Sequence, residues 1–535
     1  MLILTEKQKI MKPLTLFIFL INYATISTVS RDTMEDYMRS SGILLHISSL
    51  PGPYGIGTFG EAAYQFIDFL KKSKQSYWQI LPLGPTSYGD SPYQTFSGNA
   101  LNHYFIDLDK LIQEKLLTKK DIMMHKVNPK DINYGALYED RLPILKKAFL
   151  RFEKNKAYTK FLNQHASWLH DYALFMSLKR FFDGAPFNQW PEDIKMRYDF
   201  ALTYYNDLLK EDIEFHKFLQ FKAYQQWFLL KNYANKKGIQ IIGDIPIYLA
   251  YDSSEVWTQP QVFQLNHEKE MTHVAGVPPD GFSEDGQLWG NPLYDWGYLK
   301  HTNYDFWVAR MSSQSKLYDM IRIDHFIGFE HYYSIPAHEK TARHGVWLDG
   351  PGYDLFHTIE SRLGKLNIIA EDLGRVTTRV VELLKNTGFP GMKLTQFALY
   401  DEGNNASLPH GFPVNTVAYT GTHDNETTKS WFKHLNAKTK THVLRYTNTG
   451  SRESVTYGLI KETLKCPSKI AIIPFQDYLE LGDTGRMNEP STIGKNWRFR
   501  TVHKDFTIQL QRKIAMLTKL YGRHKEQRDE IYIES

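Results

Sequence analysis

The sequence predicts an α/β fold, a (β/α)₈ TIM barrel, from the number and spacing of its short apolar segments. Eight segments have the length of buried strands and end in polar residues, and most are separated by helical or long connecting segments. Strands that alternate with helices favour a parallel sheet, and eight such units can close a barrel. A doubly wound open sheet is the alternative, but chemically active residue types at many strand ends favour closure. The eight predicted strands are Ile43–Ile47, Tyr77–Leu83, Ile239–Leu249, Met320–Phe326, Asn367–Leu373, Gly391–Phe397, Thr416–Thr422 and Ile470–Phe475.

Two of the connections between these strands are too long for a single helix. The insertion between the second and third strands, about residues 99–235, is mostly helical, because Leu145–Phe152 and Phe215–Tyr233 are rich in helix formers with aromatic periodicity. The insertion between the third and fourth strands, about residues 250–319, is rich in Pro, Gly and Trp and predicts cleft loops. Gln509–Ser535 predicts a polar helix and tail. We therefore expect one barrel domain over residues 38–535, with no separate C-terminal β-sandwich.

Composition excludes several classes of protein. The chain has 535 residues, of which 42% are hydrophobic and 23% are charged, which excludes a disordered or fibrous protein. A net charge of +5 with no basic stripe does not favour nucleic-acid binding. The single cysteine, Cys466, allows no internal disulfide and no cysteine-cluster metal site. No His-Glu-x-x-His spacing and no phosphate-binding loop is present, so we expect neither a metal nor a cofactor. The 14% aromatic content suits either a core or a sugar-binding cleft, where rings stack on pyranose faces.

The first 37 residues do not resemble the rest of the chain. Three lysines precede a mostly apolar run, Leu14 to Ile21, and a less apolar stretch follows. This pattern fits an upstream extension of the reading frame, with Met34 or Met38 as the true start. It also fits a secretory signal, and less well a membrane anchor, because the apolar run is short. We expect residues 1–37 to be an extension or a signal-like segment.

The fourth predicted strand ends in a carboxylate that can act as a nucleophile. In Arg322-Ile323-Asp324 the arginine and the aspartate point to the same side of the strand, which in a barrel is the interior near its C-terminal mouth. A guanidinium there would keep Asp324 ionised and oriented. An ionised carboxylate at a barrel mouth can attack an electrophile. A structural ion pair is the alternative interpretation.

Two further strands end in carboxylates. Glu371 and Asp372 follow a buried strand, and partial burial beside other carboxylates would raise the pKa of Glu371 and make it a proton donor. His423 and Asp424 follow another strand and can both hydrogen-bond sugar hydroxyls. A helix N-cap and a simple turn are the respective alternatives. Two carboxylates around an anomeric carbon are the minimum set for glycoside cleavage, and coincidence of three strand-end motifs favours this chemistry.

These three segments resemble the active-site segments of a known enzyme family. Arg-Ile-Asp-His-Phe (322–326), Ala-Glu-Asp-Leu-Gly (370–374) and Thr-His-Asp-Asn (422–425) are similar to those of the 4-α-glucanotransferases, also called amylomaltases or disproportionating enzymes. This is glycoside hydrolase family 77, which is related to the α-amylases. The resemblance runs from about Ser41 to Val502. Further segments that resemble the family are ISSLPGPYGIG (47–57), WQILPLGPTSYGDSPYQ (78–94), GDIPIYLA (243–250), GVPPDGFSEDGQLWGNPLYDW (276–296) and RMNEPSTIGKNW (486–497).

The resemblance implies roles for thirteen residues. It implies Asp324 as nucleophile, Glu371 as general acid/base and Asp424 as stabiliser of the transition state. The implied sugar-binding residues are Arg322, His423 and Tyr93 at the cleavage point, Trp289 on the acceptor side, Asp280, Phe282 and Glu284 on a mobile loop, Phe397 nearby, and Tyr88 and Asp90 at the donor end. For Trp289, a place in the core is the alternative. The sequence departs from the family at Ile327, where the family usually has arginine after Asp-His-Phe.

The resemblance implies a retaining transferase that moves α-1,4-glucan segments between maltodextrins through a covalent glucanyl-enzyme. Expected partners are maltodextrins, with maltose or glucose as acceptor, and starch or glycogen. An α-1,4-glucan hydrolase of the α-amylase type and a catalytically idle glucan-binding protein are the rival interpretations. We expect a monomer or homodimer with no stable membrane association. The expected location is the cytoplasm, although the signal-like segment leaves secretion open.

Overall fold

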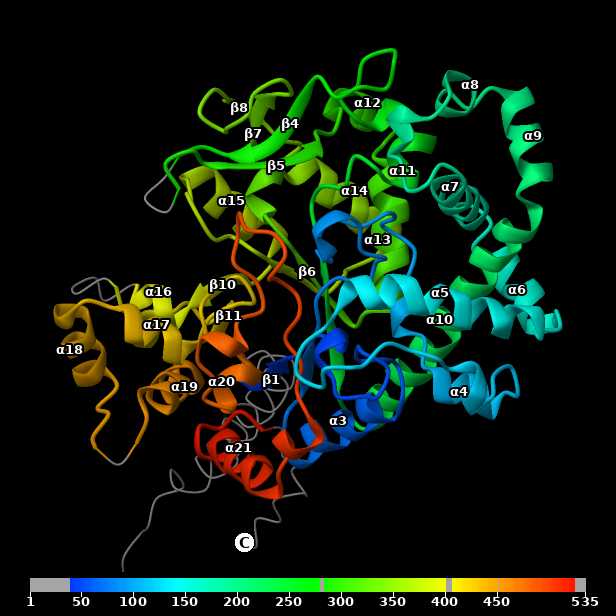
Figure 1. The fold of residues 1–535 in the computed structure, drawn as a ribbon. Helices are drawn as coiled ribbons and strands as arrows, with labels where there is room; N and C mark the ends of the chain where they lie inside the picture. The colour runs from blue at the N-terminus through cyan, green and yellow to red at the C-terminus, as the bar shows by residue number, and fades with distance from the viewer. Residues whose placement is uncertain (1–38, 280–282, 401–406, 452, 525–535) are drawn as a thin grey trace, which may run out of the picture.

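The computed structural model describes residues 39–279, 283–400, 407–451 and 453–524, and the predicted barrel is confirmed. Eight parallel strands close in the order β1-β12-β11-β10-β9-β6-β3-β2 (Figure 1). The first begins three residues before its predicted start, and the residues after most strands belong to loops or short helices. The strands are β1 (Ser40–Leu44), β2 (Tyr77–Gln79), β3 (Gln240–Ile245), β6 (Met320–Ile323), β9 (Ile368–Ala370), β10 (Gly391–Leu394), β11 (Thr416–Tyr419) and β12 (Ile470–Pro474).

The barrel strands are apolar because helices cover them outside and packed side chains fill them inside. β1, β11 and β12 are buried along their whole length, as expected of a parallel sheet covered on both faces. The interior also contains polar groups. Tyr419 of β11 donates a hydrogen bond of 2.8 Å from its hydroxyl to Gln79 Oε1 of β2.

Helices outside the barrel pack apolar side chains against its strands. In α3 (Glu61–Lys72), Phe66 packs edge-on against Trp78 and Phe475, with ring centroids 5.0 and 5.8 Å apart. Such aromatic contacts bury large apolar areas between helix and sheet. The other helices that follow the barrel strands are α13 (Asp305–Leu317), α14 (Tyr353–Leu363), α15 (Thr378–Thr387), α16 (Thr395–Ala398), α17 (Thr428–His434), α18 (Ala437–Tyr446), α19 (Val455–Lys465) and α20 (Phe475–Tyr478).

The chain between β2 and β3 is helical and forms the right-hand side of Figure 1. Its longest helix, α10, carries an aromatic face: Phe218 and Phe221 pack against Phe152 at 5.0 and 5.8 Å between ring centroids. The helices are α4 (Leu108–Gln113), α5 (Tyr134–Leu150), α6 (Lys156–Gln164), α7 (Leu169–Phe181), α8 (Glu192–Lys195), α9 (Asp199–Leu208) and α10 (Lys210–Lys236).

A second sheet, which the sequence did not predict, lies above the barrel in Figure 1. Four antiparallel strands pair in the order β5-β4-β7-β8. Residues 273–276 of β4 pair with residues 333–336 of β7, although β6 lies between them in the sequence. A local hydrophobic pattern cannot reveal such long-range pairing. The elements are α11 (Ser254–Thr258), β4 (His273–Val277), β5 (Gln287–Pro292), α12 (Trp296–His301), the 3₁₀ helix η8 (Phe326–Phe329), β7 (His331–Pro336) and β8 (Val346–Asp349).

After β12 the described chain, up to residue 524, contains helices and loops but no strand. It includes the 3₁₀ helices η10 (Asp483–Gly485) and η11 (His503–Asp505) and the helix α21 (Ile508–Leu520). Thr518 of α21 accepts a hydrogen bond of 2.8 Å from Gln75 Nε2, which ties this helix to the first β/α unit. No helix in the described ranges has both the length and the apolar character needed to cross a membrane.

Candidate active site

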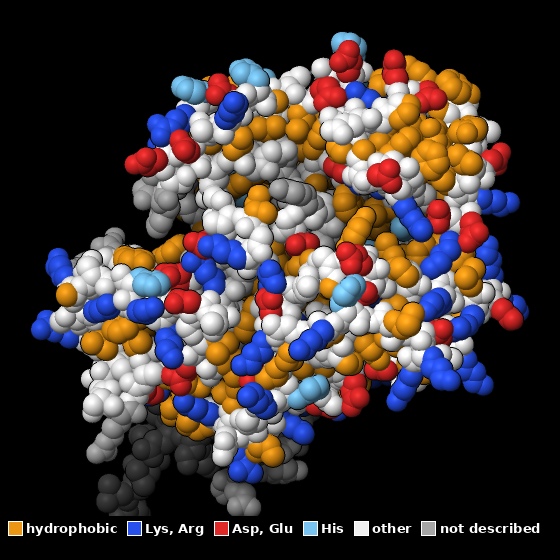
Figure 2. Space-filling view, in the orientation of Figure 1, with side chains coloured by type: hydrophobic (Ala, Val, Ile, Leu, Met, Phe, Trp, Pro, Cys, Tyr) orange, Lys and Arg blue, Asp and Glu red, His pale blue; other side chains and the backbone are white. Residues whose placement is uncertain are grey.

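The three predicted carboxylates lie at the same end of the barrel. Asp324 directly follows β6, Glu371 directly follows β9, and Asp424 lies in the turn after β11. Because all barrel strands are parallel, their C-terminal ends form one mouth, where TIM-barrel active sites are built. Figure 2 shows the surface hollowed between the antiparallel sheet above and helices α16 to α18 below.

A buried cation holds Asp324 from inside the barrel. Arg322 Nη1 donates hydrogen bonds to Asp324 Oδ1 (2.9 Å) and to both carboxylate oxygens of Asp244 (2.8 Å each). The pairing of β3 with β6 places Asp244 directly opposite Arg322. Burial alone would lower the pKa of the guanidinium, but the two carboxylates raise it well above its ordinary value. The guanidinium therefore remains charged and fixes the direction of the Asp324 carboxylate.

Tyr93 completes this buried network. Its hydroxyl donates a hydrogen bond of 2.8 Å to Asp244 Oδ2. Burial and the charge of Asp244 raise the pKa of Tyr93 well above its ordinary value, so the hydroxyl stays protonated and remains a donor. Asp244 thus links a cation beneath the nucleophile candidate to an aromatic ring at the barrel mouth.

Glu371 contacts the segment that carries Asp324. The backbone N–H of His325 donates a hydrogen bond of 2.6 Å to Glu371 Oε2, and the N–H of Phe326 donates to the Glu371 carbonyl at 2.9 Å. His325 adopts a left-handed conformation, with φ of 50°, and this bend turns the chain after Asp324. Burial raises the pKa of Glu371 well above its ordinary value; the positive charge of Arg322 opposes this effect and the negative charge of Asp324 adds to it. A carboxyl group in this environment holds a proton that it can donate.

The neighbouring carboxylate, Asp372, has a different environment. It is buried, and its Oδ1 accepts a hydrogen bond of 2.7 Å from the backbone N–H of Met392 at the start of β10. Asp372 therefore ties the end of β9 to β10. Among the described contacts, the carboxylate of Glu371 bonds to the segment that carries Asp324, and the carboxylate of Asp372 does not.

The Thr-His-Asp-Asn segment forms a tight turn that presents Asp424. Asn425 Oδ1 accepts hydrogen bonds of 2.8 Å from both the backbone N–H and the hydroxyl of Thr422, which closes the turn. His423 is buried and its Nε2 lies 3.3 Å from Asp424 Oδ2. Asp424 Oδ1 accepts a hydrogen bond of 2.6 Å from Asn488 Nδ2. The Asp424 side chain is 42% exposed and so remains accessible to a ligand.

Aromatic rings line this end of the barrel. Tyr93 stacks on His423 with ring centroids 5.1 Å apart and planes 11° apart, and Trp497 lies 5.9 Å from both rings. Trp289 of β5 contacts His325 edge-on at 4.8 Å. Trp289 is half-buried at the junction of the second sheet and the barrel mouth. Pyranose rings present C–H faces that suit such aromatic surfaces.

The other predicted site residues are placed less centrally or are not described. Phe397 of α16 is 42% exposed. Glu284 is exposed, and Asp90 is half-buried with a pKa raised by burial, which the positive charge of Arg498 opposes. Asp280 and Phe282 lie outside the described residues, as does the predicted extension of residues 1–37. The backbone of Tyr88 belongs to a 3₁₀ helix over Tyr88–Asp90, and its side chain is not described.

Three residues of this site were not singled out from the sequence. Asp244 lies within the apolar strand β3, and a carboxylate inside a buried strand does signal a buried cationic partner. Asn488 and Trp497 belong to the loop after β12, where no periodic pattern marks them. Only the folded structure brings that loop against the turn after β11.

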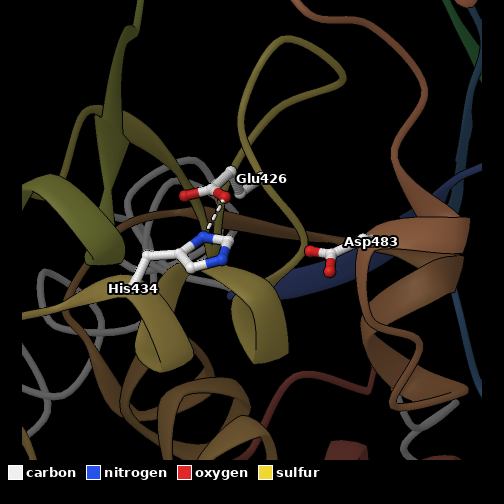
Figure 3. Close-up of side chains that lie close together, drawn as sticks. All are labelled: Glu426, His434 and Asp483. Carbon is white, nitrogen blue, oxygen red and sulfur yellow. Dashed lines mark hydrogen bonds and ion pairs between the residues drawn. The ribbon is translucent and has the colours of Figure 1, made fainter.

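The described residues contain one group of side chains that could converge on a metal ion: Glu426, His434 and Asp483, drawn in Figure 3. His434 Nδ1 is already hydrogen-bonded to Glu426 Oε1 at 2.6 Å, and Lys433 Nζ lies 3.4 Å from Asp483 Oδ2. His434 and Asp483 are exposed. These contacts describe a surface hydrogen bond and ion pair at the edge of α17, and the expectation that no metal is needed stays a prediction.

Comparisons with known proteins show which proteins this chain is similar to. A model of the 4-alpha-glucanotransferase family matches residues 45–505. A 4-alpha-glucanotransferase of Clostridium butyricum is 50% identical over 485 residues, covering 90% of this chain and all of that protein. One from Thermus thermophilus is 44% identical, covering 86% and 94%. An amylomaltase from Streptococcus agalactiae, solved in complex with acarbose, is 44% identical with a TM-score of 0.89, covering 91% of this chain and 100% of that one.

Proposed function

The chain belongs to the 4-alpha-glucanotransferase family, and on this premise we propose that it transfers α-1,4-glucan segments between maltodextrins by a retaining double displacement. Asp324 is the nucleophile, Glu371 is the general acid/base, and Asp424 binds ring hydroxyls in the transition state. The observation that carries this proposal is the hydrogen bond that joins the two segments: His325, the residue after Asp324, donates its N–H to the Glu371 carboxylate.

In the first step, Asp324 attacks the anomeric carbon as Glu371 gives its proton to the glycosidic oxygen. The C–O bond breaks, the reducing-end fragment leaves as an alcohol, and a covalent glucosyl ester forms on Asp324. In the second step, Glu371, now ionised, takes the proton from the 4-hydroxyl of another glucan. That oxygen attacks the anomeric carbon and releases Asp324. Two inversions retain the α configuration.

The electrostatics of the two carboxyl groups support this division of roles. Arg322 donates to Asp324, which suits an anion that must attack. Glu371 has a raised pKa, which suits an acid that must first hold a proton. Asp424 is held on one oxygen by Asn488 and faces His423 with the other.

Transfer instead of hydrolysis requires that an acceptor sugar occupies the site and excludes water from the glucosyl ester. Trp289 supports such an acceptor site, because it lies at the barrel mouth against His325, next to Asp324. A hydrolase of the α-amylase type would use the same carboxylates and would differ in access of water. The family assignment favours transfer.

Maltodextrins are the proposed donors, with maltose or glucose as acceptors, and starch or glycogen as larger substrates. A cytoplasmic location is proposed because the one cysteine allows no internal disulfide of the kind common in oxidising compartments. Recovery of the native protein in the cytoplasmic fraction, as a monomer or homodimer by size-exclusion chromatography with light scattering, tests these two points.

Incubation of the pure protein with maltotriose alone tests the activity. We expect glucose and a ladder of longer maltodextrins at a constant number of reducing ends. Shorter sugars with rising reducing ends would instead identify a hydrolase. The Asp324→Asn variant should lose at least about 10⁴-fold in turnover, as expected for loss of a nucleophile. Turnover unchanged in this variant would refute the assignment of Asp324.

A further inference from the structure

We propose that Asn488, in the loop after β12, is a positioning residue that fixes the carboxylate of Asp424 for contact with the sugar. The inference deepens the proposed function and rests on it, because Asp424 acts on substrate only within that mechanism. It assigns a part in the chemistry to a loop that lies far from Asp424 in the sequence.

Two hydrogen bonds connect Asn488 to the turn that carries Asp424. The side-chain amide Nδ2 donates to Asp424 Oδ1 at 2.6 Å. The backbone N–H of Asn488 donates to the carbonyl of His423 at 3.1 Å. The side chain and the backbone of one residue therefore hold two successive residues of the turn after β11.

The loop that presents Asn488 is itself fixed on both sides. Arg486 Nε donates to the carbonyl of Asn488 at 3.0 Å, and the N–H of Trp497 donates to the Met487 carbonyl at 2.7 Å. Met487 and Trp497 are both buried. Because the residues around Asn488 are anchored, its amide has a defined position from which to hold a more exposed carboxylate.

The chemistry of an amide suits this task. Asp424 needs to remain an acceptor for sugar hydroxyls, and a neutral N–H donor occupies one lone pair without cancelling the negative charge. His423 Nε2 lies 3.3 Å from the other oxygen, so the two neighbours define the plane of the carboxylate. Without the amide, the half-exposed carboxylate can rotate and lose its aim toward the ring hydroxyls.

Asn488→Asp and Asn488→Ser test the proposal, with initial rates on maltotriose counted as transfer and hydrolysis together. A hydrogen bond to a charged group contributes about 1.5–3 kcal/mol, so kcat should fall about 10- to 100-fold in both variants. KM should change much less, because a contact made in the transition state lowers kcat. In Asn488→Asp, two adjacent carboxylates share a proton, which should move the acid limb of the pH profile of kcat/KM upward by about one unit or more.

Asn436→Asp is the matched control. Asn436 is an exposed residue whose side chain accepts a hydrogen bond of 2.9 Å from the Thr439 N–H at the start of α18, so the same change adds a charge away from the site. Its pH profile and kcat should equal those of the wild-type protein. Melting temperatures of all variants separate loss of folding from loss of positioning.

The double variant with Asp424→Asn identifies the route of the effect. If Asn488 acts through Asp424, adding Asn488→Ser to Asp424→Asn should cost no further activity. A wild-type kcat and pH profile in Asn488→Asp, or full additivity in the double variant, would overturn the proposal. A wild-type protein that only hydrolyses maltotriose would refute the transferase function but leave this test readable.

Discussion

The two sides of the barrel mouth hold their carboxylates in different ways. On the side of β3, β6 and β9, Asp324 depends on a buried guanidinium that a second carboxylate, Asp244, shares. On the side of β11 and β12, Asp424 lies in a partly buried turn, its side chain is 42% exposed, and its contacts are an amide and a histidine.

This difference reflects what each carboxylate must do. In the proposed mechanism Asp324 must aim at one carbon atom, and its buried partner Arg322 is fixed by the pairing of β3 with β6. In the same proposal Asp424 must contact hydroxyl groups of a ring that changes shape, which suits a side chain that is 42% exposed. Removing a group that holds Asp324 should therefore lower both stability and activity. Removing a group that holds Asp424 should lower chiefly activity.

After the loss of the Asp324 nucleophile described above, the largest effect is expected at Glu371. Glu371→Gln should lower kcat/KM about 10²–10⁴-fold, as expected when a general acid is removed. In the wild type, the raised pKa of Glu371 should keep the basic limb of the kcat/KM profile well above the ordinary glutamate value of 4.5. A basic limb at or below that value would contradict a buried proton donor.

The same pKa makes a prediction about stability. A carboxyl group with a raised folded-state pKa contributes stability below its unfolded value, and that contribution is lost as pH rises through the folded value. Glutamine resembles the protonated form. The melting temperature of Glu371→Gln should therefore increasingly exceed that of the wild type as pH rises from 4.5 toward neutrality. A difference in melting temperature that does not change with pH would show that ionisation of Glu371 is not its cause.

A smaller effect is expected at Asp244. Asp244→Asn removes one of the two carboxylates that contact the buried guanidinium of Arg322. Breaking a buried ion pair lowers the free energy of unfolding by about 3–5 kcal/mol, and we expect a value near the lower end because Asp324 still pairs with Arg322. Activity should also fall about 10-fold or more, because Arg322 can shift. Chemical denaturation and maltotriose kinetics measure the two effects.

Asp305→Asn is the control for that change. Asp305 pairs with Arg362 at 2.6 Å, but its side chain is 66% exposed. Exposed pairs contribute about 0–1 kcal/mol, so this variant should resemble the wild type in stability and activity. Equal losses of stability in Asp244→Asn and Asp305→Asn would show that burial of the ion pair does not matter.

The smallest effect is expected at Ile327, where the family usually has arginine. Ile327 is only 3% exposed, in η8 directly after the Asp324 segment. Ile327→Arg adds a charge to a buried position, which should lower stability by about 1–3 kcal/mol and alter KM. A variant with wild-type melting temperature and KM would show that this departure has no consequence.

The positions of the three strand-end carboxylates could be predicted from the sequence. Asp324, Glu371 and Asp424 each follow an apolar strand, and parallel strands bring their C-terminal ends together whatever the lengths of the connections. The separate environments of Glu371 and Asp372 could not be predicted in this way. They depend on tertiary contacts, because Glu371 accepts from the His325 N–H and Asp372 accepts from the Met392 N–H.

The sequence by itself determined the eight-stranded parallel barrel, because the strands follow from local hydrophobic patterns. Only the tertiary structure decided the antiparallel sheet, the pairing of Asp244 with Arg322 and the contact of Asn488 with Asp424. Each joins segments that are distant in the chain. Their contacts depend on register and loop geometry, which no local pattern of residues encodes.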